Sequence, residues 1–219
     1  MVHNVRRMKK AGKPKMPRGR NGKNYLPASK NLDFVAVDVE TANSNVSSIC
    51  QVGIAVVRSG KIKDIWTQLV DPHDFFDPYN IAIHGIDQKM VNGYPRFEEL
   101  CDKIARHLGE IVVSHTFFDR RAISKAFEKC GKSLRYGTWI DSAQVARRAW
   151  PDKYALRGYN LGNVACDLGI CFRHHDAGED ARAAAEIVLR AYTDTGFGVN
   201  KLLDLGTTVK PRKPRTRIK

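Results

Sequence analysis

The chain has 219 residues, 42% of them hydrophobic, and a formal net charge of +14 at pH 7. A chain of this length can bury the core of one domain. No apolar run approaches the roughly 18 residues that a membrane-spanning helix needs, so we expect no helix that spans a membrane.

The positive charge is concentrated at the two ends of the chain. Residues 1–30 hold ten Lys and Arg side chains, residues 207–219 hold six, and neither segment holds an acid. Both ends are also poor in large apolar residues. We therefore expect a basic disordered arm over 1–30, one folded domain over 31–197 and a basic tail over 198–219. Such ends are typical of nucleic-acid binding, and solubilising ends without a partner are the alternative.

The five cysteines indicate the compartment. Cys50, Cys101, Cys130, Cys166 and Cys171 form no CxxC pair and no regular spacing. This pattern predicts reduced, mostly buried thiols in a cytoplasmic protein, nucleoid-associated if the source is bacterial, rather than a zinc site. The basic N-terminal segment is not followed by an apolar run, which argues against secretion.

Strands dominate the first half of the expected domain. Residues 32–40 (LDFVAVDVE) predict a strand, and residues 49–70 predict two more strands that are joined by a turn at Ser59-Gly60. IAIHGI, at 81–86, is expected in a connecting segment. A short buried strand is predicted at 111–114 (IVVS).

Helices are predicted later in the chain. Apolar spacing predicts a helix over 96–108, and similar patterns follow at about 119–130, 141–149, 160–168 and 177–192. A hairpin-rich start followed by a strand that alternates with helices indicates an α/β fold, with a mixed β-sheet flanked by helices.

Two acids end the first predicted strand. In FVAVDVETAN, Asp38 and Glu40 lie two residues apart on an extended chain, so their side chains leave the same face of the strand. Carboxylates held together at a buried strand end repel one another, and a divalent cation such as Mg²⁺ or Mn²⁺ relieves that repulsion. A solvent-facing strand end is the alternative.

Another acid follows the strand predicted at 111–114. Asp119 lies in SHTFFDRRAISKAF, at the expected start of a helix. Helix capping is an ordinary use of an acid in this position. The position alone therefore leaves both a capping role and a ligand role open.

HHDAGED, at 174–180, combines two histidines and three acids. Asp176 and Glu179 have the spacing of a capping box, so we expect them to start the helix. His175 lies just before that helix and Asp180 about one turn inside it. Capping leaves these two residues without a role.

These three segments resemble the exonuclease motifs of the DEDDh 3′–5′ exonucleases, a family that includes the proofreading (epsilon) subunit of bacterial replicative polymerase, ribonuclease T and oligoribonuclease. The motifs are DxET at 38–41, the acid at Asp119 and HxAxxD at 175–180. ETANSNVSSICQVGIAVV, IHGI and HHDAGEDARAAAEIVL look most like bacterial stand-alone epsilon-like exonucleases. The resemblance covers about residues 32–195 and implies a ribonuclease-H-like fold.

The resemblance assigns the four acids of the family to Asp38, Glu40, Asp119 and Asp180, and its histidine to His175. It implies two divalent metal ions, Mg²⁺ or Mn²⁺, with Asp38 bridging them. Glu40 and Asp180 would complete the first site, and Asp119 would hold the second ion. His175 would take the proton from the attacking water, since a ring that titrates near neutral pH suits a general base.

The third motif aligns on His175 rather than on His174, and the second motif differs from the usual pattern of the family. His175 and Ala177 fit HxAxxD. His174 is therefore expected to be a neighbouring residue, either at the surface or just outside the metal ligands. The second motif often reads HNxxFD, whereas HTFFD here is one residue shorter and has Thr116 in place of the usual Asn. Contacts between this loop and the substrate are therefore not implied.

Other residues are candidates of second rank. The resemblance places Thr41 against the 3′-terminal nucleotide, and a structural strand-end hydroxyl is the alternative. His84, in IHGI, is expected either to line the substrate cleft or to be structural. Asp141 is expected to be a helix N-cap rather than a ligand.

Three aromatic residues lie near the second motif. Phe117, Phe118 and Trp139 could stack on bases, although apolar aromatics beside a strand usually belong to the core. Residues 200–206 (NKLLDLG) lack the glutamine and the aromatic residue of clamp-binding peptides. The sequence therefore demonstrates no polymerase or clamp partner.

The sequence thus predicts a metal-dependent 3′–5′ exonuclease of single-stranded or frayed DNA 3′ ends, acting in replication or repair and releasing nucleoside monophosphates. A 3′–5′ exoribonuclease that trims RNA 3′ ends is the alternative, because no residue can be assigned to reading a 2′-hydroxyl. A catalytically inactive nucleic-acid-binding protein is a third possibility. All five candidate catalytic positions hold the residue types of the family, which disfavours an inactive protein.

Overall fold

A computed structural model describes residues 32–154, 157–196 and 201. The expected arm over 1–30, and the tail over 198–219 except for Lys201, lie outside the described residues. The sheet of the described domain has the strand order β3-β2-β1-β4-β5. Its strands are β1 (Phe34–Thr41), β2 (Ile49–Arg58), β3 (Lys61–Leu69), β4 (Ile111–Ser114) and β5 (Thr138–Asp141). β1, β2 and β3 pair in antiparallel fashion, and β4 and β5 continue the sheet parallel to β1.

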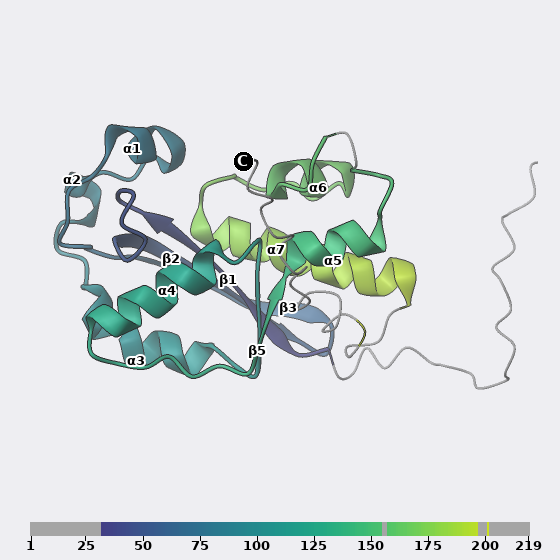
Figure 1. The fold of residues 1–219 in the computed structure, drawn as a ribbon, viewed down its shortest axis with the longest axis horizontal. Coiled ribbons are helices and arrows are strands. Elements are labelled where there is room, and N and C mark those ends of the chain that lie inside the picture. Colours follow the sequence, from purple (N-terminus) through teal and green to yellow (C-terminus); the bar gives the residue numbers. More distant parts are fainter. Residues whose placement is uncertain (1–31, 155–156, 197–200, 202–219) are drawn as a thin grey trace, which may run out of the picture.

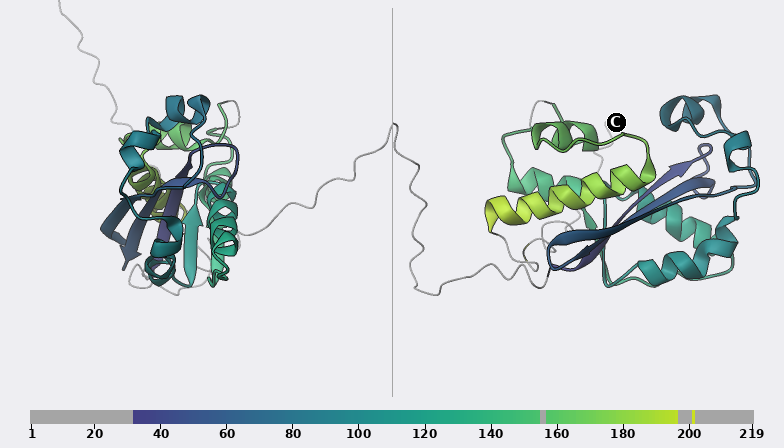
Figure 2. Two further views of the ribbon diagram at one scale, coloured as in Figure 1. Left: turned by 90° about the vertical axis from the view of Figure 1, so that its left-hand side faces the viewer. Right: turned by 180° about the vertical axis from the view of Figure 1, so that it is seen from behind.

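Helices cover both faces of this sheet, as the sequence predicted (Figures 1 and 2). They are α1 (Pro78–His84), α2 (Gln88–Val91), α3 (Phe97–His107), α4 (Phe118–Lys129), α5 (Ser142–Ala149), α6 (Leu161–Asp167) and α7 (Ala177–Thr195). α3 and α4 pack on one face, with the valines of β1, and α5, α6 and α7 pack on the other, with Phe34 and Ala36. Asp38 and Glu40 share the parity of Phe34 and Ala36, so they face α7.

The turn between β2 and β3 confirms the predicted hairpin. Ser59 has a φ of 52° and Gly60 a φ of 70°. Two consecutive left-handed residues define the two-residue turn whose twist matches that of antiparallel strands. The pairing of Arg58 with Lys61 closes the hairpin directly beside this turn.

The connecting segment expected over 81–86 is wrong in part, because α1 extends into it. The side chain of Asp77 accepts a hydrogen bond from the Tyr79 N–H, Pro78 occupies the first turn and Gly85 ends the helix with a φ of 75°. These are ordinary helix signals. None of the residues of α1 is buried, and its seven residues are fewer than the window over which a helical period can be detected.

α7 begins unusually close to the sheet. The Ala177 N–H donates to Gln51 Oε1 over 2.9 Å, and a Cβ atom on Gly53 would lie 2.0 Å from the Ala177 carbonyl oxygen. Gly53 is the register partner of Asp38. A residue without a side chain therefore lets the first turn of α7 approach the strand pair that carries Asp38.

The cysteines are free thiols, as predicted. Only Cys50 and Cys101 are buried, however, and Cys166 and Cys171 are exposed, so the expectation of mostly buried thiols is wrong. No helix among the described residues is both long enough and apolar enough to cross a membrane.

Candidate active site

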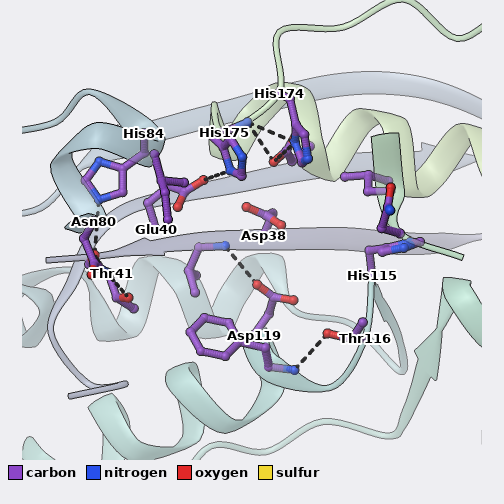
Figure 3. A pocket seen from close by; sticks show the side chains of 16 residues that line it. Asp38, Glu40, Thr41, Asn80, His84, His115, Thr116, Asp119, His174 and His175 are labelled. Carbon is purple, nitrogen blue, oxygen red and sulfur yellow. Dashed lines mark hydrogen bonds and ion pairs between the residues drawn. The ribbon is translucent and has the colours of Figure 1, made fainter. Parts of the chain in front are cut away.

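Three carboxylates from two elements meet at one end of β1. Asp38 and Glu40 come from β1, and Asp180 comes from the first turn of α7. One oxygen of each carboxylate lies within 4.8 Å of an oxygen of the other two. Figure 3 shows Asp38 between Glu40 and Asp119 in the cleft that these side chains line. The acids that the sequence singled out at distant positions are thus brought together.

Asp119 reaches the same cleft from the start of α4. β1 pairs with β4 only at Val35 and Ala36, so the next N–H groups of β1 have no partner strand on that side. Asp119 Oδ1 accepts the hydrogen bond of the Val39 N–H over 3.1 Å. The Asp119 carboxylate is buried at the side of Asp38 and lies outside the group of three carboxylates within 4.8 Å.

Burial and mutual repulsion make this cluster hold protons. Burial, followed by the charges of Asp119 and Asp180, raises the pKa of Asp38 well above its usual value. Burial also raises the pKa of Glu40 to about 8 and that of Asp119 to about 7. The pKa of Asp180 is raised by burial as well, in spite of its contact with His174.

A divalent cation fits this donor set. The cluster offers only carboxylate oxygens, which are the ligands that hard cations such as Mg²⁺ and Mn²⁺ prefer. Carboxylates that ionise with difficulty when they are alone would ionise readily around a positive charge. The side chains of Asp38, Glu40 and Asp180 can therefore hold a divalent metal ion.

His175 faces the cluster from the residue pair just before α7. Its backbone is left-handed, with a φ of 66°, and its side chain is 40% exposed. Its Nδ1 atom lies 3.8 Å from Glu40 Oε1. Burial, together with the neighbouring His174, lowers the pKa of His175, which keeps the ring neutral at pH 7 and able to accept a proton.

The start of α7 confirms one half of the predicted capping box. Asp176 is the N-cap and accepts hydrogen bonds from the Gly178 and Glu179 N–H groups over 3.1 and 3.2 Å. The return bond expected from Glu179 is wrong. Its carboxylate instead pairs with Arg182 over 2.7 Å, one turn along the helix.

Thr41 and His84 are tied together through α1. Asn80 Nδ2 donates to the Thr41 carbonyl oxygen over 2.7 Å, and His84 Nε2 lies 3.2 Å from the same oxygen. His84 Nδ1 accepts the Ile86 N–H, so Nε2 carries the proton. Both predicted residues line the cleft and are also structural. Asn80, which sequence reasoning missed, lines the cleft beside them (Figure 3).

The loop of the second motif is held by the protein itself. His115 Nε2 donates to the Tyr159 carbonyl oxygen over 2.9 Å, while Nδ1 accepts the Ser142 hydroxyl over 2.9 Å. Asp141 caps α5 through the Ala143 N–H, which confirms its predicted role, and it also accepts the Thr116 N–H over 3.1 Å. His115 is therefore a structural residue at the cleft wall.

The three aromatic residues near this loop have different surroundings. Trp139 is buried and donates to Ser114 Oγ, and Phe117 packs against the core below α4. Phe118 is 43% exposed and lines the cleft. Of the three, Phe118 is placed to stack on a base.

The cleft has a volume of about 320 Å³. Its walls come from the end of β1, from α1, from the start of α4 and from the segments before α6 and α7. A second cavity of about 290 Å³ adjoins it and shares His84, His174 and His175 with it. These three rings therefore form the wall between the two spaces.

The chain belongs to the Exonuclease (RNase T) family, whose model matches residues 35–188. It is 35% identical over 162 residues to a DNA polymerase III PolC-type of Clostridium perfringens, an alignment that covers 71% of this chain and 11% of the relative. It is 29% identical over 164 residues to the 3′-5′ exonuclease DinG of Staphylococcus saprophyticus. That alignment covers 73% of this chain and 18% of the relative. The chain thus spans less than a fifth of either relative.

Solved structures show the same fold. Exonuclease X, in complex with 5′ overhanging duplex DNA, matches with a TM-score of 0.60 at 24% identity. The match covers 78% of this chain and 98% of the Exonuclease X chain. The nuclease domain of 3′hExo, a DEDDh family member bound to rAMP, matches with a TM-score of 0.63 at 17% identity. The match covers 74% of this chain and 92% of the 3′hExo chain. The ribonuclease-H-like fold implied by the sequence is confirmed.

Proposed function

We propose that this protein is a metal-dependent 3′–5′ exonuclease that removes nucleoside monophosphates from the 3′ end of single-stranded or frayed DNA. The observation that carries the proposal is the meeting of Asp38, Glu40 and Asp180, with His175 beside them, in one open cleft. Asp119 lines the same cleft. Membership of the exonuclease family supports the same activity.

The carboxylates serve as metal ligands in this proposal. Two divalent ions, Mg²⁺ or Mn²⁺, would supply activation of the attacking water, neutralisation of the phosphoryl oxygens and stabilisation of the leaving oxygen. Asp38 is central because its pKa is raised by both Asp119 and Asp180, so both carboxylates lie close to it. We assign Asp38 to both ions, Glu40 and Asp180 to the first, and Asp119 to the second.

His175 serves as the general base. Its ring is part of the cleft wall and remains reachable by solvent, and its lowered pKa leaves it unprotonated at neutral pH. Nδ1 lies on the side of Glu40, so the ring can take a proton from water held beside that carboxylate.

The substrate would enter between α1 and the start of α4. Thr41 and His84 are proposed to contact the terminal nucleotide from one wall, and exposed Phe118 offers a stacking surface on the other. We favour DNA because the PolC-type relative is a DNA polymerase. Trimming of RNA 3′ ends is the second candidate, since the 3′hExo domain of the same fold binds rAMP.

The test uses 3′-labelled and 5′-labelled single-stranded DNA and matched RNA, each with Mg²⁺, Mn²⁺ or EDTA. We expect loss of the 3′ label first, only with metal, and faster on DNA than on RNA. His175→Ala should lower kcat by about 10²- to 10⁴-fold, because it removes the proton acceptor. The control variant is His107→Ala. His107 is the last residue of α3, stacks on Trp66 of β3 and is not part of the cleft wall. Initial loss of the 5′ label, or equal activity in EDTA, would refute the proposal.

The basic ends are proposed to gather the polyanionic substrate. Deleting residues 1–30 and 207–219 removes sixteen Lys and Arg side chains and leaves a nearly neutral chain. We expect KM to rise in low salt and the salt dependence of binding to flatten, since fewer counterions are released. Turnover of a saturating short oligonucleotide should stay nearly unchanged. An unchanged KM at low ionic strength would show that the ends do not bind substrate.

A further inference from the structure

His174 makes a close contact with one of the proposed metal ligands. Its Nδ1 atom lies 3.1 Å from both Oδ1 and Oδ2 of Asp180. The His175 backbone N–H lies 3.1 Å from Asp180 Oδ2. When Asp180 is ionised, as it is when it ligates a metal ion, its carboxylate only accepts hydrogen bonds, so Nδ1 of His174 carries a proton and donates it. The His175 N–H, which also lies 3.1 Å from that Nδ1, then donates to Asp180 Oδ2. Two donors thus hold the Asp180 carboxylate from the side of the 174–175 segment.

The ring of His174 also supports the ring of His175. The two ring centroids are 4.0 Å apart, and the planes differ by 10°, so the imidazoles are stacked. The His175 side chain is 40% exposed, and its Nδ1 atom lies 3.8 Å from Glu40 Oε1. The stacked neighbour therefore restricts the orientations that the His175 ring can adopt.

His174 is itself braced from the other direction. Its ring centroid lies 5.3 Å from that of Phe172. A Cβ atom on Gly162, in α6, would lie 3.7 Å from Cδ2 of His174, which is ordinary van der Waals contact. The ring thus lies near both Phe172 and Gly162, although its side chain is 44% exposed.

We propose that His174 is a positioning residue that fixes the metal ligand Asp180 through its N–H donor and the general base His175 through its ring. The proposal rests on the proposed function. Residues that hydrogen-bond to metal ligands orient them, and their loss typically costs about 10- to 100-fold in metal affinity or activity. The two roles belong to different parts of the imidazole, so different substitutions separate them.

The experiment compares wild type with His174→Phe and His174→Asn. Phenylalanine keeps a ring for the stack and lacks the donor, whereas asparagine keeps an N–H donor near the Nδ1 position and lacks the ring. Mn²⁺ binding to the full-length, metal-stripped protein is measured by calorimetry without substrate, and kcat and KM are measured separately. Thermal unfolding of each variant confirms folding.

We expect His174→Phe to bind Mn²⁺ about 10-fold more weakly than wild type. His174→Asn should bind Mn²⁺ close to wild type but show a lower kcat at unchanged KM, since only the His175 ring is released. Wild-type affinity in the Phe variant, or equal losses of affinity in both variants, would overturn the proposal. Because Mn²⁺ affinity is read without substrate, a wild type that binds Mn²⁺ but degrades no nucleic acid refutes the proposed function and still tests His174.

Discussion

Asp38→Asn is expected to abolish hydrolysis while stabilising the metal-free protein above neutral pH. Removing a residue that hydrogen-bonds to a metal ligand already costs up to about 100-fold in metal affinity or activity. Removing the central ligand itself should therefore lower kcat by more than about 100-fold. The same substitution removes the carboxylate with the strongest electrostatic conflict, because Asp38 is repelled by Asp119, Asp180 and Glu40. A neutral amide of the same shape relieves that repulsion.

The pH dependence of stability tests the electrostatic half of this prediction. Folding raises the pKa of Glu40 from 4.5 to about 8 and that of Asp119 from 3.8 to about 7. The folded state therefore binds more protons than the unfolded state between these limits. The contribution of these two groups to the stability of the metal-free protein is therefore greatest below about pH 4. It falls as the pH rises above that value, and the loss is complete once the pH has passed through the folded pKa values of about 7 and 8.

Thermal unfolding in EDTA from pH 5 to pH 8.5 measures this effect. We expect the Tm of wild type to fall over that range, the Tm of Asp38→Asn to fall less, and Mn²⁺ to raise the Tm of wild type but not that of Asp38→Asn. Each 1 kcal/mol corresponds to about 2–4 °C for a chain of this size. Asp152, an exposed acid in a turn, supplies the control Asp152→Asn. A lower Tm of Asp38→Asn than of wild type at pH 8 would contradict the prediction.

Gly53→Ala is expected to damage stability and activity together, although Gly53 is not part of the cleft wall. Its Cβ atom would lie 2.0 Å from the Ala177 carbonyl oxygen and 2.3 Å from the Gly178 nitrogen. Both are backbone atoms, so no rotamer change relieves the clash and the start of α7 must move away from the sheet. Asp180 moves with α7, which separates it from Asp38.

We expect a loss of about 3 kcal/mol or more in the free energy of unfolding, the upper end of what overpacking costs. Chemical denaturation measures that loss, and calorimetry of the folded variant should show weakened Mn²⁺ binding. Gly109 supplies the matched control, because a Cβ atom there meets nothing within 4 Å. Gly109→Ala should keep both properties. A Gly53→Ala variant with the stability and Mn²⁺ affinity of wild type would show that the close approach of α7 does not position Asp180.

The sheet was largely predictable because its central strands carry strong local signals. β1 and β2 are long, β-branched and bounded by turn residues, and the Ser59-Gly60 turn specifies the hairpin. β5 was not predicted, because only Trp139 and Ile140 of its four residues are apolar, whereas β4, of the same length, has three apolar residues in a row. α1 was missed for a different reason, since its caps are clear but it has only seven residues and buries none of them.

The candidate site was predictable where position along an element decides direction. The alternation of β1 placed Asp38 and Glu40 on one face, and the capping role of Asp176 fixed the start of α7 and hence the depth of Asp180. The contacts of Asn80 with Thr41 and of His174 with Asp180 depend on how separate segments pack, which local patterns do not encode. The sequence therefore left open whether His174 is a surface residue or a neighbour of the ligands, and its ring contacts Asp180, a proposed ligand.

The most direct test of the site is an anomalous difference map from crystals of the protein grown with Mn²⁺. We predict a strong peak bonded to carboxylate oxygens of Asp38, Glu40 and Asp180, the three acids that lie within 4.8 Å of one another. A second peak beside Asp119 is expected when a nucleotide is bound. A principal peak on the rings of His174 and His175, or no peak at the acids at saturating Mn²⁺, would contradict the assignment.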